Sequence, residues 1–302
     1  TINYYVGFTM LNLDRTTDEE VDSATALMRI NTIERPGDYY ENYIYAILNA
    51  SLNNHAEAKR VLENLAKRYP AKTELFPMLA KSYAAQGNFD KAIATIDSLE
   101  KTEGRTVTTT SMKVNYLFNT GDTAAIINNG KLLLHDAPNS AVPNALMGNI
   151  FAQLNMPDSA FAYYDRALII EPDYGYANLQ KAYLYNSLGD STNYEKEISA
   201  TLLNKNIDVD TKVDILTDYI RDCIQQGDSS ARVDNMFRTI LNQHPHEAQI
   251  RHLFSDYLSF KKDYKNAAEQ LSYVLDIDPS DPKNWERLIW LEIFNNNYDK
   301  AI

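Results

Sequence analysis

The sequence predicts an all-α protein, a right-handed superhelical solenoid of antiparallel helix pairs, and three observations support this class. The six residues NFDKAI at 88–93 return as NYDKAI at 297–302. Four prolines, Pro36, Pro70, Pro138 and Pro172, are separated by 34, 68 and 34 residues. Apolar residues recur every three or four positions, and two-residue alternation never persists, which favours helices over strands.

The composition is typical of a folded chain with a sizeable core. Hydrophobic residues make up 44 % and charged residues 23 % of the 302 positions, and the formal net charge is −12. This charge argues against nucleic-acid binding, which needs clustered cations to neutralise phosphates. Cys223 is the only cysteine, so no disulfide can form within the chain. No apolar run reaches the roughly 18 residues that a membrane-spanning helix needs.

A frame of 34 residues laid from Tyr5 covers the chain in about eight and a half repeats, each predicted to hold two helices. The repeats are 5–38, 39–72, 73–106, 107–140, 141–174, 175–208, 209–247, 248–281 and a truncated 282–302. Repeat 209–247 is longer, and four of its extra residues extend its first helix, Asp210 to Gln226. Because four residues are nearly one helical turn, the buried face stays aligned.

Each pair of helices is predicted to be joined by a tight turn at one frame position. The first helix should end in the left-handed conformation that Gly and Asn tolerate, at Asn53, Gly87, Gly121, Asn155, Gly189, Gly227 and Asn296. The next residue should cap the second helix with its side-chain oxygen, at Asn54, Asn88, Asp122, Asp190, Asp228, Asp263 and Asn297. The aromatic that follows, as in Phe89 or Tyr298, is expected to enter the core.

Small and aromatic residues mark the predicted core. Alanine shares one frame position, where it should let two helices approach closely, at Ala24, Ala58, Ala92, Ala160, Ala267 and Ala301. Nine of the 21 tyrosines are assigned to inward or turn positions: Tyr45, Tyr83, Tyr116, Tyr164, Tyr185, Tyr194, Tyr219, Tyr264 and Tyr298.

These features resemble the tetratricopeptide-repeat family, and in particular bacterial scaffolds with many such repeats. Repeat 141–174 places Gly148, Phe151, Ala160, Tyr164, Ala167 and Pro172 where the family has its small residue, aromatic, alanine, aromatic, alanine and proline. The departures are a family tryptophan present only as Trp285, and Tyr194 and Arg232 at the alanine position. The segment TVTTTS, 106–111, should be a poor helix start because β-branched residues lose rotamer freedom there. Repeats 107–140, 175–208 and 209–247 are therefore expected to be bent or less stable.

The resemblance implies that the first helix of each repeat lines a concave face, which binds an extended peptide or a partner's helix. Solenoids offer such a curved surface in place of a deep pocket. The predicted function is a non-catalytic protein–protein interaction scaffold. The candidate contact residues are Tyr40, Tyr43, Lys81, Met112, Asn115, Asn149, Gln153, Tyr176, Gln180, Tyr183 and Asn186. Lys81 is nearly the only cation among them, which favours a largely uncharged peptide over a carboxylate clamp.

Two other functions stay open. One is a glycan-binding helical-repeat protein of a bacterial envelope, with exposed tyrosines stacked on sugar rings. The other is a spacer region within a larger protein. Ala301 and Ile302 should need cover, so we expect further repeats after residue 302, or self-association through this end. The compartment is unknown, with the bacterial periplasm or cell envelope slightly favoured over the cytoplasm.

No catalytic residue, metal site or cofactor is predicted. His244, His246 and His252 are close in sequence, but two of them flank Pro245 in a turn and lack the fixed fourth ligand of a zinc site. The segment 276–282, DIDPSDP, lacks the glycine and the closing glutamate of a calcium loop. Cys223 is expected to be half exposed, without the basic surroundings that activate a thiol.

Overall fold

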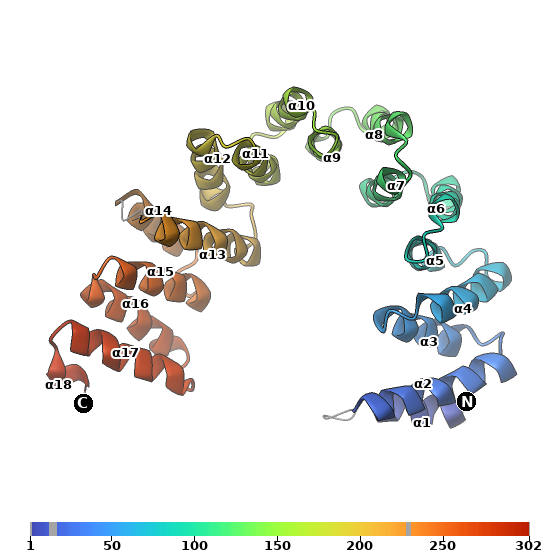
Figure 1. The fold of residues 1–302 in the computed structure, drawn as a ribbon, viewed down its shortest axis with the longest axis horizontal. Coiled ribbons are helices and arrows are strands. Elements are labelled where there is room, and N and C mark those ends of the chain that lie inside the picture. The colour runs from blue at the N-terminus through green and yellow to red at the C-terminus, as the bar shows by residue number, and fades with distance from the viewer. Residues whose placement is uncertain (1, 12–16, 228–230, 302) are drawn as a thin grey trace. The chain divides into compact units, whose positions relative to one another are not determined.

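The computed structural model describes residues 2–11, 17–227 and 231–301, and within them every regular element is an α-helix (Figure 1). The helices are α1 (Ile2–Leu11), α2 (Asp18–Glu34), α3 (Tyr39–Ser51), α4 (His55–Arg68), α5 (Leu75–Ala84), α6 (Phe89–Glu103), α7 (Val107–Thr120), α8 (Thr123–Asp136), α9 (Ala141–Gln153), α10 (Pro157–Ile170), α11 (Gly175–Ser187), α12 (Ser191–Leu203), α13 (Val209–Gln226), α14 (Ala231–Gln243), α15 (Ala248–Phe260), α16 (Tyr264–Ile277), α17 (Pro282–Phe294) and α18 (Tyr298–Ala301). The expected all-α solenoid class is confirmed.

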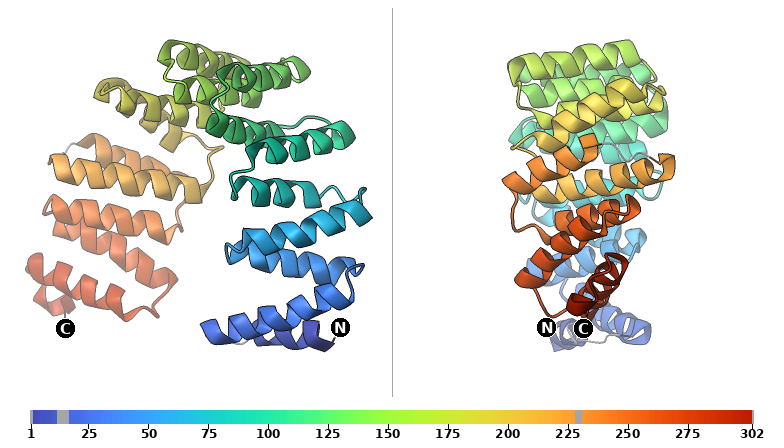
Figure 2. Two further views of the ribbon diagram at one scale, coloured as in Figure 1. Left: turned by 45° about the vertical axis from the view of Figure 1, so that its right-hand side comes forward. Right: turned by 90° about the vertical axis from the view of Figure 1, so that its left-hand side faces the viewer.

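The chain forms two compact units, Thr1–Met156 and Pro157–Ile302. In the first unit each helix packs on the next along the chain, and Figure 2 shows these helices as near-parallel layers. Helices α3, α5, α7 and α9 lie on the inner side of this unit's curve, with α4, α6 and α8 on the outer side (Figure 1). The boundary between the units falls between α9 and α10, inside the predicted repeat 141–174. The division into 34-residue repeats stays a prediction.

The left-handed turns lie where the frame places them. A positive φ is found at Asn53, Gly87, Gly121, Asn155, Gly189, Gly227 and Asn296. Lys262 occupies the same frame position with a φ of 62°. Its residue type did not predict this, because lysine rarely adopts the left-handed conformation.

The predicted caps are formed by aspartate but not by asparagine. Asp122, Asp190 and Asp263 each accept a hydrogen bond from a backbone N–H in the first turn of the helix that follows. The prediction is wrong for Asn54 and Asn88, whose side chains make no capping bond. The amide of Asn54 instead donates to Asn49 Oδ1 at 2.9 Å. A carboxylate has only acceptors to offer, whereas an amide can turn its donor elsewhere.

Two predicted caps have other outcomes. The amide of Asn297 donates to Glu292 Oε2 at 3.0 Å. Asp228 lies outside the described residues, as does Ile302 at the end of the chain.

The prediction of a poor helix start at 106–111 is wrong. Helix α7 begins at Val107, and Thr106 and Thr109 cap each other reciprocally. The Thr109 N–H donates to Thr106 Oγ1 at 3.1 Å, and the Thr106 N–H donates to Thr109 Oγ1 at 3.0 Å. These bonds satisfy two free donors of the first turn, which offsets the low helix propensity of the threonines.

The alanines predicted to lie between two helices are fully buried in both units. Ala24, Ala58, Ala92, Ala160 and Ala267 are all 0 % exposed; the side chain of Ala301 lies outside the described residues. Arg232, which replaces this alanine in repeat 209–247, pairs with Glu195 and donates to Tyr219 Oη at 2.6 Å. The guanidinium at this position therefore reaches polar partners at the edge of the core.

Two burial predictions are corrected. Cys223 is only 4 % exposed, because it lies on the face of α13 that packs in the core of the second unit. Of the nine tyrosines assigned inward, eight are buried or half-buried, but Tyr298 is 58 % exposed. Helix α18 has four residues, so little packs over this ring within the described part of the chain.

Two lysines, the buried Lys113 and the half-buried Lys181, link successive helix pairs, one in each unit. Lys113 Nζ lies 2.7 Å from Asp97 Oδ1 and 3.0 Å from Glu100 Oε2. Lys181 Nζ, 68 positions later, lies 3.0 Å from Asp165 Oδ1, the frame equivalent of Asp97. A buried cation needs such partners, since an unpaired one would cost several kcal/mol. The pairs therefore fix the register of one hairpin on the next.

The turn geometry yields a matched pair of predictions. Gly87→Ala should lower the free energy of unfolding by about 1 kcal/mol, because an L side chain is strained at positive φ. Lys262→Gly should raise it by about 0.5–1 kcal/mol by removing the same strain. Urea unfolding followed by circular dichroism measures both, and equal shifts of one sign would contradict the argument.

Candidate functional site

The structure leaves all eleven candidate contact residues at least partly accessible. Those that are exposed are Tyr40, Lys81, Asn115, Gln153, Tyr176, Tyr183 and Asn186, and those that are half-buried are Tyr43, Met112, Asn149 and Gln180. Seven lie in the first unit, on α3, α5, α7 and α9. Tyr176, Gln180, Tyr183 and Asn186 lie on α11 in the second unit. The set is thus divided between two separate surfaces.

Two rows of residues run across the first helices of the first unit. One frame position holds Ile44, Met78, Met112 and Leu146, which are all half-buried. Three residues further along each helix stand Ile47, Lys81, Asn115 and Asn149. Residues three apart share a helix face, so an apolar row runs beside a mainly polar one. The sequence analysis found Met112 but missed Ile44, Met78 and Leu146, although their 34-residue spacing could have revealed them.

The inner helices of the first unit are nearly free of charge. Helices α3, α5, α7 and α9 contain three charged residues, Glu41, Lys81 and Lys113. Glu41 is buried and accepts from Asn31 Nδ2 at 2.5 Å, and Lys113 is buried in the ion pair described above. On these four helices Lys81 is therefore the one exposed charged side chain.

The outer helices differ sharply in this respect. Helix α4 alone carries Glu57, Lys59, Arg60, Glu63, Lys67 and Arg68. Helix α6 carries Asp90, Lys91, Asp97, Glu100, Lys101 and Glu103. The charges of the first unit thus gather on its outer helices, away from the two rows.

A cluster of tyrosines lies at the start of α3. Tyr39 packs edge-on against Tyr40 and Tyr69 and stacks on Tyr43, with ring centroids 5.4, 5.4 and 5.7 Å apart. Tyr39 Oη donates to Glu74 Oε1 at 2.6 Å. Burial and this hydrogen bond raise the pKa of Tyr39, and the same bond lowers the pKa of Glu74. Tyr40, held by this cluster, is 74 % exposed.

The accessible face of α11 in the second unit has an acidic neighbour. Tyr176 Oη donates to Asp208 Oδ2 at 2.9 Å, which raises the pKa of Tyr176. The pKa of Tyr183 is raised by burial and then by the charges of Asp218 and Asp214 on α13. Helix α13 carries an aspartate at every fourth position, at 210, 214, 218 and 222. The sequence shows this spacing, but it could not show that Asp214 and Asp218 lie near Tyr183.

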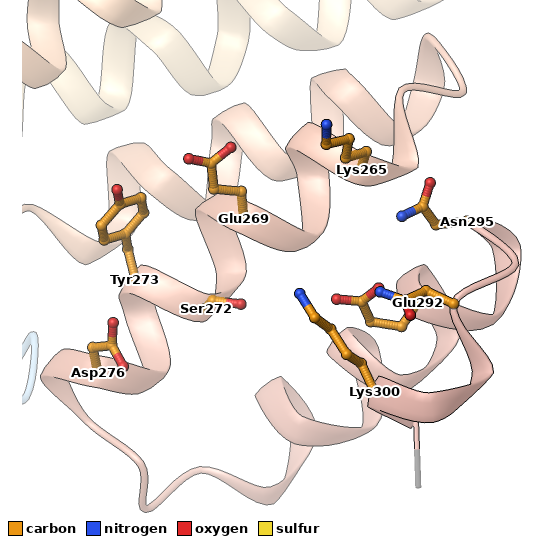
Figure 3. A pocket seen from close by; sticks show the side chains of 9 residues that line it. Lys265, Glu269, Ser272, Tyr273, Asp276, Glu292, Asn295 and Lys300 are labelled. Atoms are coloured by element: carbon orange, nitrogen blue, oxygen red, sulfur yellow. The ribbon is translucent and has the colours of Figure 1, made fainter.

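The crevice in Figure 3 has a volume of about 500 Å³ and lies between α16 and the α17–α18 turn. Lys265 and Glu269 lie on its α16 wall, opposite Glu292, Asn295 and Lys300. A crevice of about 530 Å³ between α2 and α4 has the same frame positions in its lining. Its floor is Asn49, the frame equivalent of Glu292, and both are buried.

Arg15, at the same frame position in repeat 5–38, lies outside the described residues. The remaining six repeats carry an apolar or aromatic residue or a cysteine there: Tyr83, Leu117, Phe151, Tyr185, Cys223 and Leu258. The two crevices therefore arise where a polar residue leaves the groove between outer helices unfilled. They follow from packing and mark no special chemistry.

Two of the three clustered histidines face cations. His244 Nε2 lies 3.3 Å from Lys212 Nζ, and His252 Nδ1 lies 3.5 Å from an Arg287 nitrogen. In the described part of the chain, no group of three or more His, Cys, Asp or Glu side chains is placed to hold a metal ion. Among the same residues, no helix has the length and apolar character to cross a bilayer.

The helix pairs and the exposed rows define a helical-repeat array with an accessible inner face. Residues 50–105 match the family described as "Tetratricopeptide repeat". The resemblance drawn from the sequence is thereby confirmed. Tetratricopeptide-repeat proteins in general serve as scaffolds for protein–protein interaction and are generally not catalytic. No curated protein matches the chain.

Several solved structures are similar to the chain at low sequence identity. The structure of Naa15/Naa10 bound to HypK-THB is 14 % identical over 99 % of this chain and 56 % of its own, with a TM-score of 0.50. A tetratricopeptide repeat protein from Parabacteroides merdae is 16 % identical over 84 % of this chain and 98 % of its own, with a TM-score of 0.44. YrrB, described as having an unusual peptide-binding site, is 11 % identical over 58 % and 90 %, with a TM-score of 0.38.

The tyrosine cluster gives a prediction with an internal control. Tyr39→Phe should lower the free energy of unfolding by about 1 kcal/mol, because it removes the hydrogen bond to Glu74 while keeping the ring packing. The pKa of Glu74 should rise in this variant, as measured by NMR titration. Tyr40→Phe, one position along in the exposed ring, should change neither quantity; a loss of stability there as well would contradict the assignment.

Proposed function

We propose that the inner face of the first unit binds a largely uncharged peptide segment, and that the protein is a non-catalytic interaction scaffold. The observation that carries this proposal is the segregation of charge. A chain with a net charge of −12 keeps one exposed charged side chain on α3, α5, α7 and α9. Solvated helix faces normally carry many charges, so a face without them favours an uncharged partner.

The two rows would make different kinds of contact with a partner. Apolar side chains of the partner would pack on Ile44, Met78, Met112 and Leu146, at about 25 cal/mol for each Å² of apolar surface removed from water. Asn115 and Asn149 each combine a donor and an acceptor and can bond a peptide group from either side. Tyr40 and Tyr43 would add contact area at the start of α3. Lys81, the one exposed cation on these four helices, would favour one acidic side chain at the matching position of the partner.

The accessible face of α11 belongs to the same proposal as a second contact surface. Tyr176, Gln180, Tyr183 and Asn186 offer aromatic and amide groups there. Because Tyr183 lies near Asp214 and Asp218, this surface would favour a less acidic part of a partner than the first unit requires. We extend the proposal to a location in a bacterial periplasm or cell envelope, which fractionation of native cells would test.

Glycan binding is a second candidate, and one observation favours it. Tyr40 is 74 % exposed while its neighbour Tyr39 is fixed by packing and a hydrogen bond, so a sugar ring could stack on a held aromatic face. A glycan array probed with the wild-type chain and with Tyr40→Ala tests it. Binding that the variant loses supports glycan recognition, and an array without signal removes it.

The peptide proposal is tested by placing a charge in the polar row. A displayed peptide library selected on the wild-type chain should yield segments poor in charged residues. Asn115→Glu should weaken the selected peptides at least tenfold, because a carboxylate would be desolvated against an uncharged segment. Asn128→Glu, an exposed asparagine on the outer helix α8, is the matched control and should bind normally. Equal affinity of both variants, or selection of strongly charged peptides, would count against the inner face.

A further inference from the structure

Lys212, in the first turn of α13, is a fully buried lysine with unusual partners. Its side chain is 0 % exposed, and its ammonium nitrogen lies 2.8 Å from Gln243 Oε1 and 3.3 Å from His244 Nε2. Lys113, which is also buried, contacts two carboxylates instead. At Lys212 the acceptors are a neutral amide and an imidazole.

This cluster joins three helices of the second unit. Gln243 ends α14, and its own amide donates to the carbonyl oxygen of Leu203 at the end of α12, at 3.0 Å. His244 follows in the turn before α15. Lys212, Gln243 and His244, here called the Lys212 latch, therefore hold the start of α13 against the ends of α12 and α14.

The charges around the latch make protonation of His244 unfavourable. In the neutral imidazole one ring nitrogen can accept a hydrogen bond, whereas the imidazolium only donates. A protonated His244 would also place a second cation 3.3 Å from the buried ammonium of Lys212. The charge of Glu247, in the turn before α15, opposes this effect, and Arg251 of α15 turns to the Pro245 carbonyl oxygen.

The titration of both groups agrees with this geometry. Burial and the Lys212 charge lower the pKa of His244, and burial lowers the pKa of Lys212. The pKa of His252 on α15 is also lowered. Burial and the charge of Arg287 lower it, and they outweigh the charges of Asp256 and Asp281, which raise it. The unfolded chain thus binds protons more readily than the folded one, and stability is lost as pH falls below about 6.5, the ordinary histidine value.

We propose that the Lys212 latch is an acid-sensitive switch, closed at neutral pH and released when His244 gains a proton. Release frees the first turns of α13 from the end of α14. Helix α13 also carries Asp214 and Asp218, the aspartates near Tyr183. The accessible face of α11 would then change with acidity, while the first unit would not. The switch does not depend on what either surface binds.

Hydrogen exchange of the full chain at pH 7.5 and pH 5.5, corrected for intrinsic rates, tests the switch. Amides of 209–217 and 238–247 should exchange about tenfold faster at pH 5.5, since a hydrogen bond to a charged group is lost. Amides of α3 to α8 should keep their protection. Unchanged protection of 209–217 in the wild-type chain would overturn the proposal.

Four variants separate this latch from other histidines. His244→Gln keeps an acceptor but cannot be protonated, so its protection at pH 5.5 should match that at pH 7.5. His246→Gln, in the same turn and exposed, should behave as the wild-type chain does. If His252→Gln, and not His244→Gln, abolishes the acid response, the assignment to Lys212 and His244 is overturned. Lys212→Met should also abolish the faster exchange at pH 5.5, and this variant tests the latch without altering the imidazole of His244.

Discussion

The close approach of two helices at a fully buried alanine is the contact on which the rest of each unit depends. Where alanine is present, its methyl group fits between the two helices, and bulkier groups around it complete the packing. Repeats 107–140, 175–208 and 209–247 hold larger side chains at this position, Ile126, Tyr194 and Arg232. With the two helices of a pair set this way, their apolar sides have no cover of their own and must be covered by the next pair. The 34-residue spacing of such contacts follows from this need.

A fixed crossing in turn aligns the outward-facing residues of successive pairs. Positions that share a place in the frame form rows across α3, α5, α7 and α9, and these rows extend over a surface that no single helix could offer. The charges needed for solubility lie on the outer helices. Lys113, paired with Asp97 on α6, keeps one helix pair of the first unit in register with the next and so supports these rows. Lys181 makes the equivalent contact with Asp165 within the second unit.

Features that depend on local residue chemistry were predicted well from the sequence. The left-handed turns and the buried alanines each rest on a few neighbouring residues and their intrinsic preferences. The failures share another origin. Whether Asn54 caps a helix depends on Asn49, which accepts its amide, and the burial of Cys223 depends on helices that pack around α13.

The candidate surface likewise has features that local residue chemistry predicts and features that depend on packing. The frame identified accessible residues such as Tyr40 and Asn115, but the charge poverty of the whole inner face appeared only once buried Glu41 and Lys113 could be separated from exposed Lys81. Lys262 and Lys212 illustrate the limit most clearly. Each residue contradicts its usual preference, by backbone conformation in one case and by burial in the other, and only the surrounding fold accounts for it.

The neutral inner face has a consequence for the environments in which the first unit can work. Dissolved ions weaken attraction between charged surfaces beyond a Debye length, about 10 Å in 0.1 M salt, and leave contacts between uncharged groups almost untouched. A surface built from methionine, isoleucine, leucine and asparagine should therefore lose little of its affinity for the proposed peptide as the salt concentration rises, in contrast to a surface that depends on ion pairs.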